Sequence, residues 1–254
     1  MPMTTNSALF EYCLRLGDNS LILGHRLSEW CGHAPVLEQD IALINVALDL
    51  VGQATNLLEY AAVVENKGRT ADDLAFLRDS YHFRNATLVE QPNGDFACTI
   101  VRQYLYDTFH YHLYQQLTHS KDATLAAIAE KSIKEISYHV RHSGEWFVRL
   151  GDGTEESRSR MQNALNELWM FTGDLFIMDE VDQVLLKENI AVDLNAIKKL
   201  WLEQISAQVQ RATLTLPSST YMLTGGKEGK HTEHLSILLA EMQVLQRTYP
   251  GAQW

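Results

Sequence analysis

The stretch 134–139, Lys-Glu-Ile-Ser-Tyr-His, resembles half of a metal-binding motif, with His139 at the position of a ligand. In carboxylate-bridged di-metal helix bundles, two helices each give one acidic ligand, and the other two each give Glu-x-x-His with both side chains facing inward. Ile136 stands at the glutamate position of this motif, so the histidine is present and the bridging carboxylate is missing. The sequence therefore predicts either an altered oxygenase or a relative without catalytic metal.

Polar side chains within apolar segments on three other helical patterns are further candidates for the same centre. Glu29 precedes Trp30, Asp107 lies in Tyr-Leu-Tyr-Asp-Thr-Phe, and Gln53 ends a polar series at 45, 49 and 53 in an otherwise apolar segment. Positions four apart share one face of a helix, so we expect Gln53 and its series to face the interior. Buried polar groups need partners, which predicts a polar centre made by four helices.

Two other pairs leave an alternative open. Asp107-x-x-His110 and Glu135-x-x-x-His139 each place an acid and an imidazole on one helix face, as metal pairs do. An independent metal-dependent oxygenase would use these four residues. Each of them taken alone more often has a structural role in a core or on a surface.

The C-terminal region contains a second histidine pair and a loop of glycines and lysines. His231-x-x-His234, with Glu233, has zinc-ligand chemistry but no third ligand in sequence, so a helix-capping or interface role is favoured. In the loop 224–230, backbone amides with Lys227 and Lys230 could surround an anion, although such a segment is more often a surface loop.

Composition limits the function classes. The chain has 254 residues, 46% of them hydrophobic, and a net charge of −11, which repels phosphate backbones and anionic lipid. Nucleic acid and membranes are therefore not expected as partners. Three widely spaced cysteines and the absence of a signal-peptide pattern predict a reducing cytoplasm.

Helical periodicity dominates the whole chain. We expect long helices near 7–31, 35–65, 96–118 and 122–150, the second with Pro35 in its first turn, and a short helix opened by the capping box Thr70-x-x-Asp73. Asp95 should cap the third long helix, and further helices should span 155–178, 180–188, 194–213 and 231–248. This pattern predicts an all-α fold, an antiparallel four-helix bundle with additional C-terminal helices in one domain, 1–254.

Five segments, spread over nearly the whole chain, resemble one protein family. They are Arg-Leu-Gly-Asp-Asn at 15–19, Leu-Ser-Glu-Trp-Cys-Gly-His-Ala-Pro at 27–35, Ala-Leu-Asp-Leu-Val-Gly-Gln-Ala at 47–54, Leu-Val-Glu-Gln-Pro-Asn-Gly at 88–94, and 224–235. Together they are similar to the PaaC-type structural subunit of bacterial ring-1,2-phenylacetyl-CoA epoxidases. The resemblance implies a ferritin-like fold and a place in a multicomponent monooxygenase complex of aerobic phenylacetate catabolism.

The same resemblance assigns positions relative to the family's homologous di-iron catalytic subunit. Glu29, Asp107 and His139 match retained ligands, whereas Gln53 stands where that subunit has a histidine. Leu50 and Ile136 stand where it has the two glutamates that bridge the metals. Two iron ions need several anionic oxygens, so we expect no metal in this chain. Glu29, Gln53, Asp107 and His139 would then form a vestigial polar network in which a protonated His139 pairs with carboxylate.

The resemblance also implies partners. The chain should bind and stabilise the di-iron catalytic oxygenase subunit as a heterodimer within a larger assembly, which a reductase with FAD and an iron-sulfur cluster serves. Lys227 and Lys230 could contact the coenzyme A phosphates of substrate held by the catalytic subunit. A helical interaction protein unrelated to oxygenases fits the composition but leaves the aligned polar residues unexplained.

Overall fold

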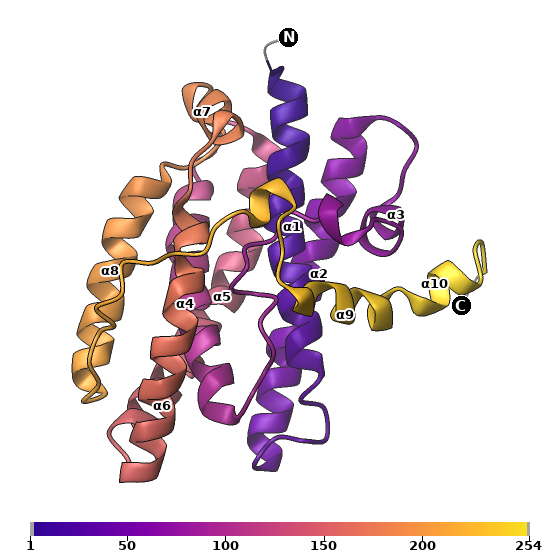
Figure 1. The fold of residues 1–254 in the computed structure, drawn as a ribbon. Helices are drawn as coiled ribbons and strands as arrows, with labels where there is room; N and C mark the ends of the chain where they lie inside the picture. Colours follow the sequence, from indigo (N-terminus) through magenta and orange to yellow (C-terminus); the bar gives the residue numbers. More distant parts are fainter. Residues whose placement is uncertain (1–2, 253–254) are drawn as a thin grey trace. The chain divides into compact units, whose positions relative to one another are not determined.

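The computed structural model describes residues 3–252, and these residues form helices and loops without any β-strand (Figure 1). The predicted all-α class is confirmed. The chain divides into two compact units. Unit 1 contains the residues up to 92, 183–185 and those from 225 onward, and unit 2 contains 93–182 and 186–224.

Unit 1 is built on a hairpin of two long helices, α1 (Thr5–Ser28) and α2 (Leu37–Glu65), which pack along each other (Figure 1). Gly24 of α1 lies so close to α2 that an added Cβ would meet the Ala47 carbonyl oxygen at 3.2 Å. Leu23 and Leu27 of α1 and Leu43 of α2 are fully buried. Because burying each such side chain is worth about 2 kcal/mol, the apolar faces hold this hairpin together.

Short elements complete unit 1. They are α3 (Ala71–Phe76), η1 (Ser80–His82), η3 (Gly226–Glu228), α9 (Glu233–Met242) and α10 (Val244–Thr248). Gln243, between α9 and α10, donates from Nε2 to the carbonyl oxygens of Ala75 and Arg78 at 3.1 and 3.0 Å. This contact fastens the C-terminal helices to the segment after α3.

Helix α2 is the one helix in residues 3–252 that is long and apolar enough to cross a membrane. Half of its most apolar window is buried within the structure, as in the core helix of a folded domain. Leu50, Gln53 and Ala54 lie on its buried side.

Unit 2 is organised around α4 (Phe96–Leu117), which packs against α5 (Ala123–Gly151), α6 (Glu155–Leu168) and α8 (Leu194–Arg211). Trp201 of α8 donates from Nε1 to the carbonyl oxygen of Leu105 at 2.8 Å. The segment also contains η2 (Trp169–Phe176) and α7 (Glu180–Lys187), and residues 183–185 of α7 group with unit 1.

The caps expected from sequence are present. Thr70 and Asp73 form the reciprocal capping box of α3, and Asp95 accepts from the backbone N–H of Cys98 at the start of α4. Asp122, which the sequence marked only as a helix boundary, also accepts from the Thr124 and Leu125 amides at the start of α5. Each such cap contributes about 1 kcal/mol.

Three predicted boundaries were wrong. Pro35 precedes α2, which begins at Leu37. The helix expected over 155–178 ends at Leu168 and tightens into η2, where Gly173 lies against Met222 and the Met170 carbonyl accepts from the Leu223 amide. The helix expected over 231–248 is divided into α9 and α10.

Candidate functional site: a buried carboxyl centre and a carboxylate–imidazole cluster

Asp107 is the centre of a polar group inside unit 2. Its carboxyl group is completely buried on α4. Gln103 donates from Nε2 to Oδ1 at 2.6 Å, and Ser143 of α5 donates from Oγ to Oδ2 at 2.7 Å. Burial raises the pKa of Asp107 to about 6, although the nearby His139 and the two hydrogen bonds act in the opposite direction. Both carboxyl oxygens thus have hydrogen-bond partners, one on α4 and one on α5.

His139 and Ile136 lie on consecutive turns of α5, and both are fully buried. The His139 backbone carbonyl is within 2.9 Å of Ser143 Oγ, the hydroxyl that also reaches Asp107. Ile136 adds an aliphatic side chain on the same buried face. Asp107 and His139 thus lie near each other within unit 2, and Gln103 and Ser143 are polar neighbours that sequence reasoning missed. The predicted pairing of a protonated His139 ring with the carboxylate stays a prediction.

His110 of the alternative metal set is also buried in unit 2. Its ring lies beside Tyr106 and Tyr114, with centroid distances of 5.1 and 4.3 Å. Neither ring nitrogen has a hydrogen-bond partner among the described residues. Burial, and then the nearby His139, lower the pKa of His110 well below its ordinary value, so the imidazole is neutral. Glu135, the fourth member of that set, is only partly buried.

The three remaining candidate positions belong to unit 1. Leu50 and Gln53 are buried on α2, at 0% and 1% exposure. Glu29, expected to face the interior, is instead exposed at the C-cap of α1, where it accepts from Arg26 Nη1 at 2.7 Å. The prediction of Glu29 as a buried network member was wrong, because α1 ends at Ser28 and the chain turns there.

The polar series before Gln53 also differs from expectation. Asn45 is exposed and Asp49 is partly exposed, whereas Gln53 is buried. Eight residues of an α-helix advance by about 80° around the axis, so a series at i, i+4 and i+8 drifts from one side of the helix to another. Gln53 alone reaches the buried side.

The donor set does not fit a di-iron centre. Two iron ions require several carboxylate oxygens, and the buried positions assigned to the bridging glutamates hold the hydrocarbon side chains of Leu50 and Ile136. Within residues 3–252, no group of three or more His, Cys, Asp or Glu side chains is placed to hold a metal ion. Asp107 is engaged by two hydrogen-bond donors instead.

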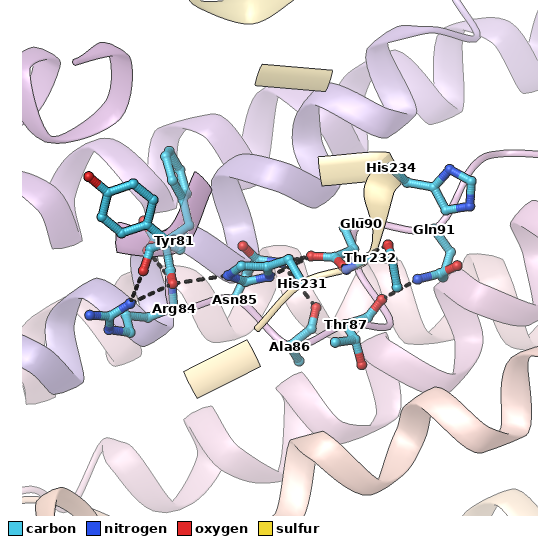
Figure 2. Close-up of polar contacts among 12 residues, drawn as sticks. Tyr81, Arg84, Asn85, Ala86, Thr87, Glu90, Gln91, His231, Thr232 and His234 are labelled. Carbon is cyan, nitrogen blue, oxygen red and sulfur yellow. Dashed lines mark hydrogen bonds and ion pairs between the residues drawn. The ribbon is translucent and has the colours of Figure 1, made fainter. Parts of the chain in front are cut away.

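A second polar cluster surrounds Glu90 in unit 1 (Figure 2). The fully buried carboxylate accepts from the Thr232 amide at 2.6 Å, from Thr232 Oγ1 at 2.8 Å, from Asn85 Nδ2 at 2.8 Å and from His231 Nδ1 at 2.8 Å. Arg26 also joins the cluster, because it donates from Nε and Nη2 to the Glu90 backbone carbonyl. The cluster thus connects the loop before α4 to the residues that begin α9.

His231 bridges two acceptors in this cluster. Its Nδ1 faces Glu90, and its Nε2 lies 3.1 Å from the carbonyl oxygen of Phe83. Burial disfavours the charged ring, but the hydrogen bond and charge of Glu90, with the Phe83 carbonyl, raise the pKa of His231 above its ordinary value. With both nitrogens facing acceptors, the ring acts as a structural cation.

This arrangement decides the role of the second histidine pair. His231 pairs with Glu90 inside unit 1, and the ring of His234 lies apart from the cluster (Figure 2). The His234 backbone carbonyl accepts from Arg26 Nη2 at 3.0 Å. A zinc pair is not formed by these residues.

Sequence reasoning also missed a buried ion pair between Asp18 and Arg78. Asp18 is fully buried, and Arg78 donates to both of its oxygens while the Arg84 amide donates at 2.8 Å. The signal was present, because Asp18 and Glu90 both lie in segments that carry the family resemblance. Acids buried within a mainly apolar segment are retained when they are paired.

The glycine- and lysine-containing loop is fixed at one point. Gly229 has a φ of +79°, and an added Cβ would lie 2.1 Å from the Tyr81 carbonyl oxygen. Lys230 is exposed and pairs with Glu228 at 2.5 Å, and Lys227 is partly buried beside it. Both lysines lie at the surface of unit 1.

The helices and buried polar clusters described above define an all-α helical protein. The family model described as phenylacetic acid catabolic protein matches residues 1–254, and the chain belongs to this family. The all-α structure agrees with the ferritin-like class of this family. A relative from Escherichia coli (strain K12), which is one of the subunits of 1,2-phenylacetyl-CoA epoxidase, is 53% identical over 246 residues. The match covers 97% of this chain and 99% of the relative, and it confirms the resemblance found in the sequence.

Proposed function

We propose that the chain is a non-catalytic structural subunit of a phenylacetyl-CoA epoxidase complex, in which it binds and stabilises a homologous di-iron catalytic subunit. The proposal extends the name of the similar E. coli protein, an epoxidase subunit, to this chain. The observation that carries it is the chemistry of the former ligand positions. Asp107 accepts hydrogen bonds from Gln103 and Ser143. The buried aliphatic side chains of Leu50 and Ile136 stand at the positions assigned to the bridging glutamates.

A surface for the catalytic subunit is available on α2. Leu37, Ile41 and Leu48 are 71%, 52% and 64% exposed and follow one another at i, i+4 and i+11. This spacing places them on one helix face, and exposed apolar faces of this kind mark protein–protein contacts. We assign this face to the heterodimer contact. Replacing Leu48 by aspartate should therefore weaken co-purification, whereas Leu202→Asp, at a 42% exposed position of α8, should not.

The other subunits of the proposed complex would supply the metal centre and the redox cofactors. In the proposed assembly the di-iron centre belongs to the catalytic subunit, and the reductase carries FAD and the iron-sulfur cluster. The proposed compartment is the cytoplasm. Lys227 and Lys230 would add a contact to the coenzyme A phosphates of substrate held by the catalytic subunit. If replacing both lysines leaves coenzyme A binding by the complex unchanged, that contact does not exist.

Co-expression with the catalytic subunit tests the structural role. We expect the two chains to co-purify, and the catalytic subunit to lose solubility or thermal stability when this chain is omitted. The alternative function, an independent oxygenase that uses Asp107, His110, Glu135 and His139, predicts oxygen-dependent turnover by this chain alone. Turnover without the catalytic subunit would overturn the proposal.

A further inference from the structure

Unit 2 contains a surface cavity of about 300 Å³ between α5 and α8. The polar residues of its wall come from both helices. α5 contributes Arg141, Gly144 and Glu145, and α8 contributes Gln204, Gln208 and Arg211. The cavity is separate from the buried Asp107 group and takes no part in the structural role proposed above.

The two arginines of this wall differ from most others in the chain because they lack acidic partners. Arg141 lies over the ring of Tyr138 at 5.6 Å, and Arg211 donates to Gln208 Oε1 at 3.1 Å. Within residues 3–252, neither guanidinium has a carboxylate within 4.0 Å, although both are exposed. Six arginines of unit 1, by contrast, are each paired with an acid: Arg15, Arg26, Arg69, Arg78, Arg84 and Arg247.

Neutral groups complete the floor of the cavity. Gln208 donates from Nε2 to the Gly144 carbonyl oxygen at 2.7 Å, and Gln204 lies 2.8 Å from His112 Nε2 through its Oε1. A Cβ on Gly144 would approach a ring atom of Tyr104 at 3.0 Å and Gln208 Nε2 at 3.2 Å. The glycine therefore lets α5 approach these side chains closely.

The charge of the wall is positive in a chain whose net charge is −11. Two guanidinium groups and one carboxylate, Glu145, give a local charge of 2 − 1 = +1. Guanidinium groups present paired N–H donors that match the oxygens of phosphate, and a cavity of this size accommodates a phosphate or a pyrophosphate group.

We propose that this cavity binds the phosphate or pyrophosphate group of a small molecule, with Arg141 and Arg211 as the two cationic contacts. Glu145 opposes binding by its charge and limits the affinity. The site is open to solvent, so each contact is screened and contributes about a fivefold factor in affinity.

Calorimetric titration of the full chain at low salt tests this proposal, with pyrophosphate and ADP as probes. Pyrophosphate should bind, and Arg141→Gln and Arg211→Gln should each weaken binding about fivefold. Glu145→Gln should tighten it, because the one opposing charge is removed. Tighter binding of ADP than of pyrophosphate would identify the ligand as a nucleotide, and equal binding would identify it as an inorganic anion or a simple phosphate ester.

Arg149→Gln is the matched control. Arg149 lies on α5 over the ring of Trp146 at 4.9 Å and does not line the cavity. We expect this variant to bind pyrophosphate like the wild type. The proposal is overturned if the wild type shows no binding up to about 10 mM pyrophosphate, which would leave less than about 3 kcal/mol of binding free energy. It is also overturned if Arg149→Gln weakens binding as much as Arg141→Gln, because only general surface charge would then be at work.

Discussion

Replacing Asp107 by asparagine should stabilise the protein at neutral pH, because the change removes a buried charge and keeps the shape of the side chain. Burial raises the pKa of Asp107 from 3.8 to about 6, against the lowering effects of His139, Ser143 and Gln103. The difference, 6 − 3.8 or about 2, corresponds to about 3 kcal/mol of unfolding free energy at a pH above both values.

The sign of the pH dependence follows from the same values. A carboxyl group whose folded pKa is the higher one stabilises the protein below its unfolded pKa, and this contribution is lost as pH rises through the folded pKa. We expect wild type to lose about 3 kcal/mol between about pH 4 and pH 7 from this group, and Asp107→Asn to lack that loss. The variant keeps both hydrogen bonds. Gln103 Oε1 has no partner among the described residues, so the Gln103 side chain can rotate and accept from the amide of the new asparagine, while the asparagine oxygen accepts from Ser143.

Urea unfolding followed by circular dichroism at pH 4.5 and pH 7.5 measures this difference. Asp152→Asn is the matched control, because Asp152 is exposed at the C-cap of α5 in the same unit. The control should change the unfolding free energy by less than about 0.5 kcal/mol at either pH. A loss of more than about 2 kcal/mol in Asp107→Asn at pH 7.5 would refute the argument, because it would show that the ionised carboxylate is needed, as it is for a metal ligand.

Three further predictions concern unit 1. Glu90→Gln should lower the unfolding free energy, measured in urea, by about 3 kcal/mol, because four donors lose a buried carboxylate. Glu59→Gln, at an exposed position, should have little effect, and equal values for the two variants would contradict a stabilising role of the Glu90 cluster. The raised pKa of His231 stabilises the protein below its ordinary pKa of about 6.5, and this stability is lost as pH rises through the folded pKa. His231→Gln should flatten the pH profile of the melting temperature above that value, and an unchanged profile would argue against a charged ring. Gly229→Ala and Gly68→Ala both strain a φ near +79°, but only the former meets a carbonyl oxygen, so its melting temperature should fall further; equal falls would show that the loop moves freely.

Local signals in the sequence predicted much of the fold. The capping residues Thr70 and Asp95 begin α3 and α4, as expected from the preference of helix starts for such side chains. Such caps act within one turn of chain, so the sequence contains all the information they need. The 3-10 turn η2 that follows α6 lies instead against Met222, a residue far along the chain that is close to Gly173.

The candidate site was predicted less completely, for the same reason. Asp107 was found because it lies among large apolar residues, and His139 because it stands at the histidine position of an altered Glu-x-x-His motif; both are fully buried. Glu90 and His231 are 141 residues apart, and no periodicity links a loop carboxylate to an imidazole before a distant helix. Glu29 was misplaced because its apolar neighbours suggested burial, whereas the end of α1 turns its side chain outward.

The iron content of the chain purified alone, after incubation with ferrous iron and gel filtration, tests the central claim most directly. The account predicts that the protein is folded and retains no stoichiometric iron, because Leu50 and Ile136 stand at the bridging positions. The triple variant Leu50→Glu, Gln53→His, Ile136→Glu should retain more iron than the wild type. A stable pair of iron ions in each wild-type chain, together with oxygen-dependent turnover, would contradict the account.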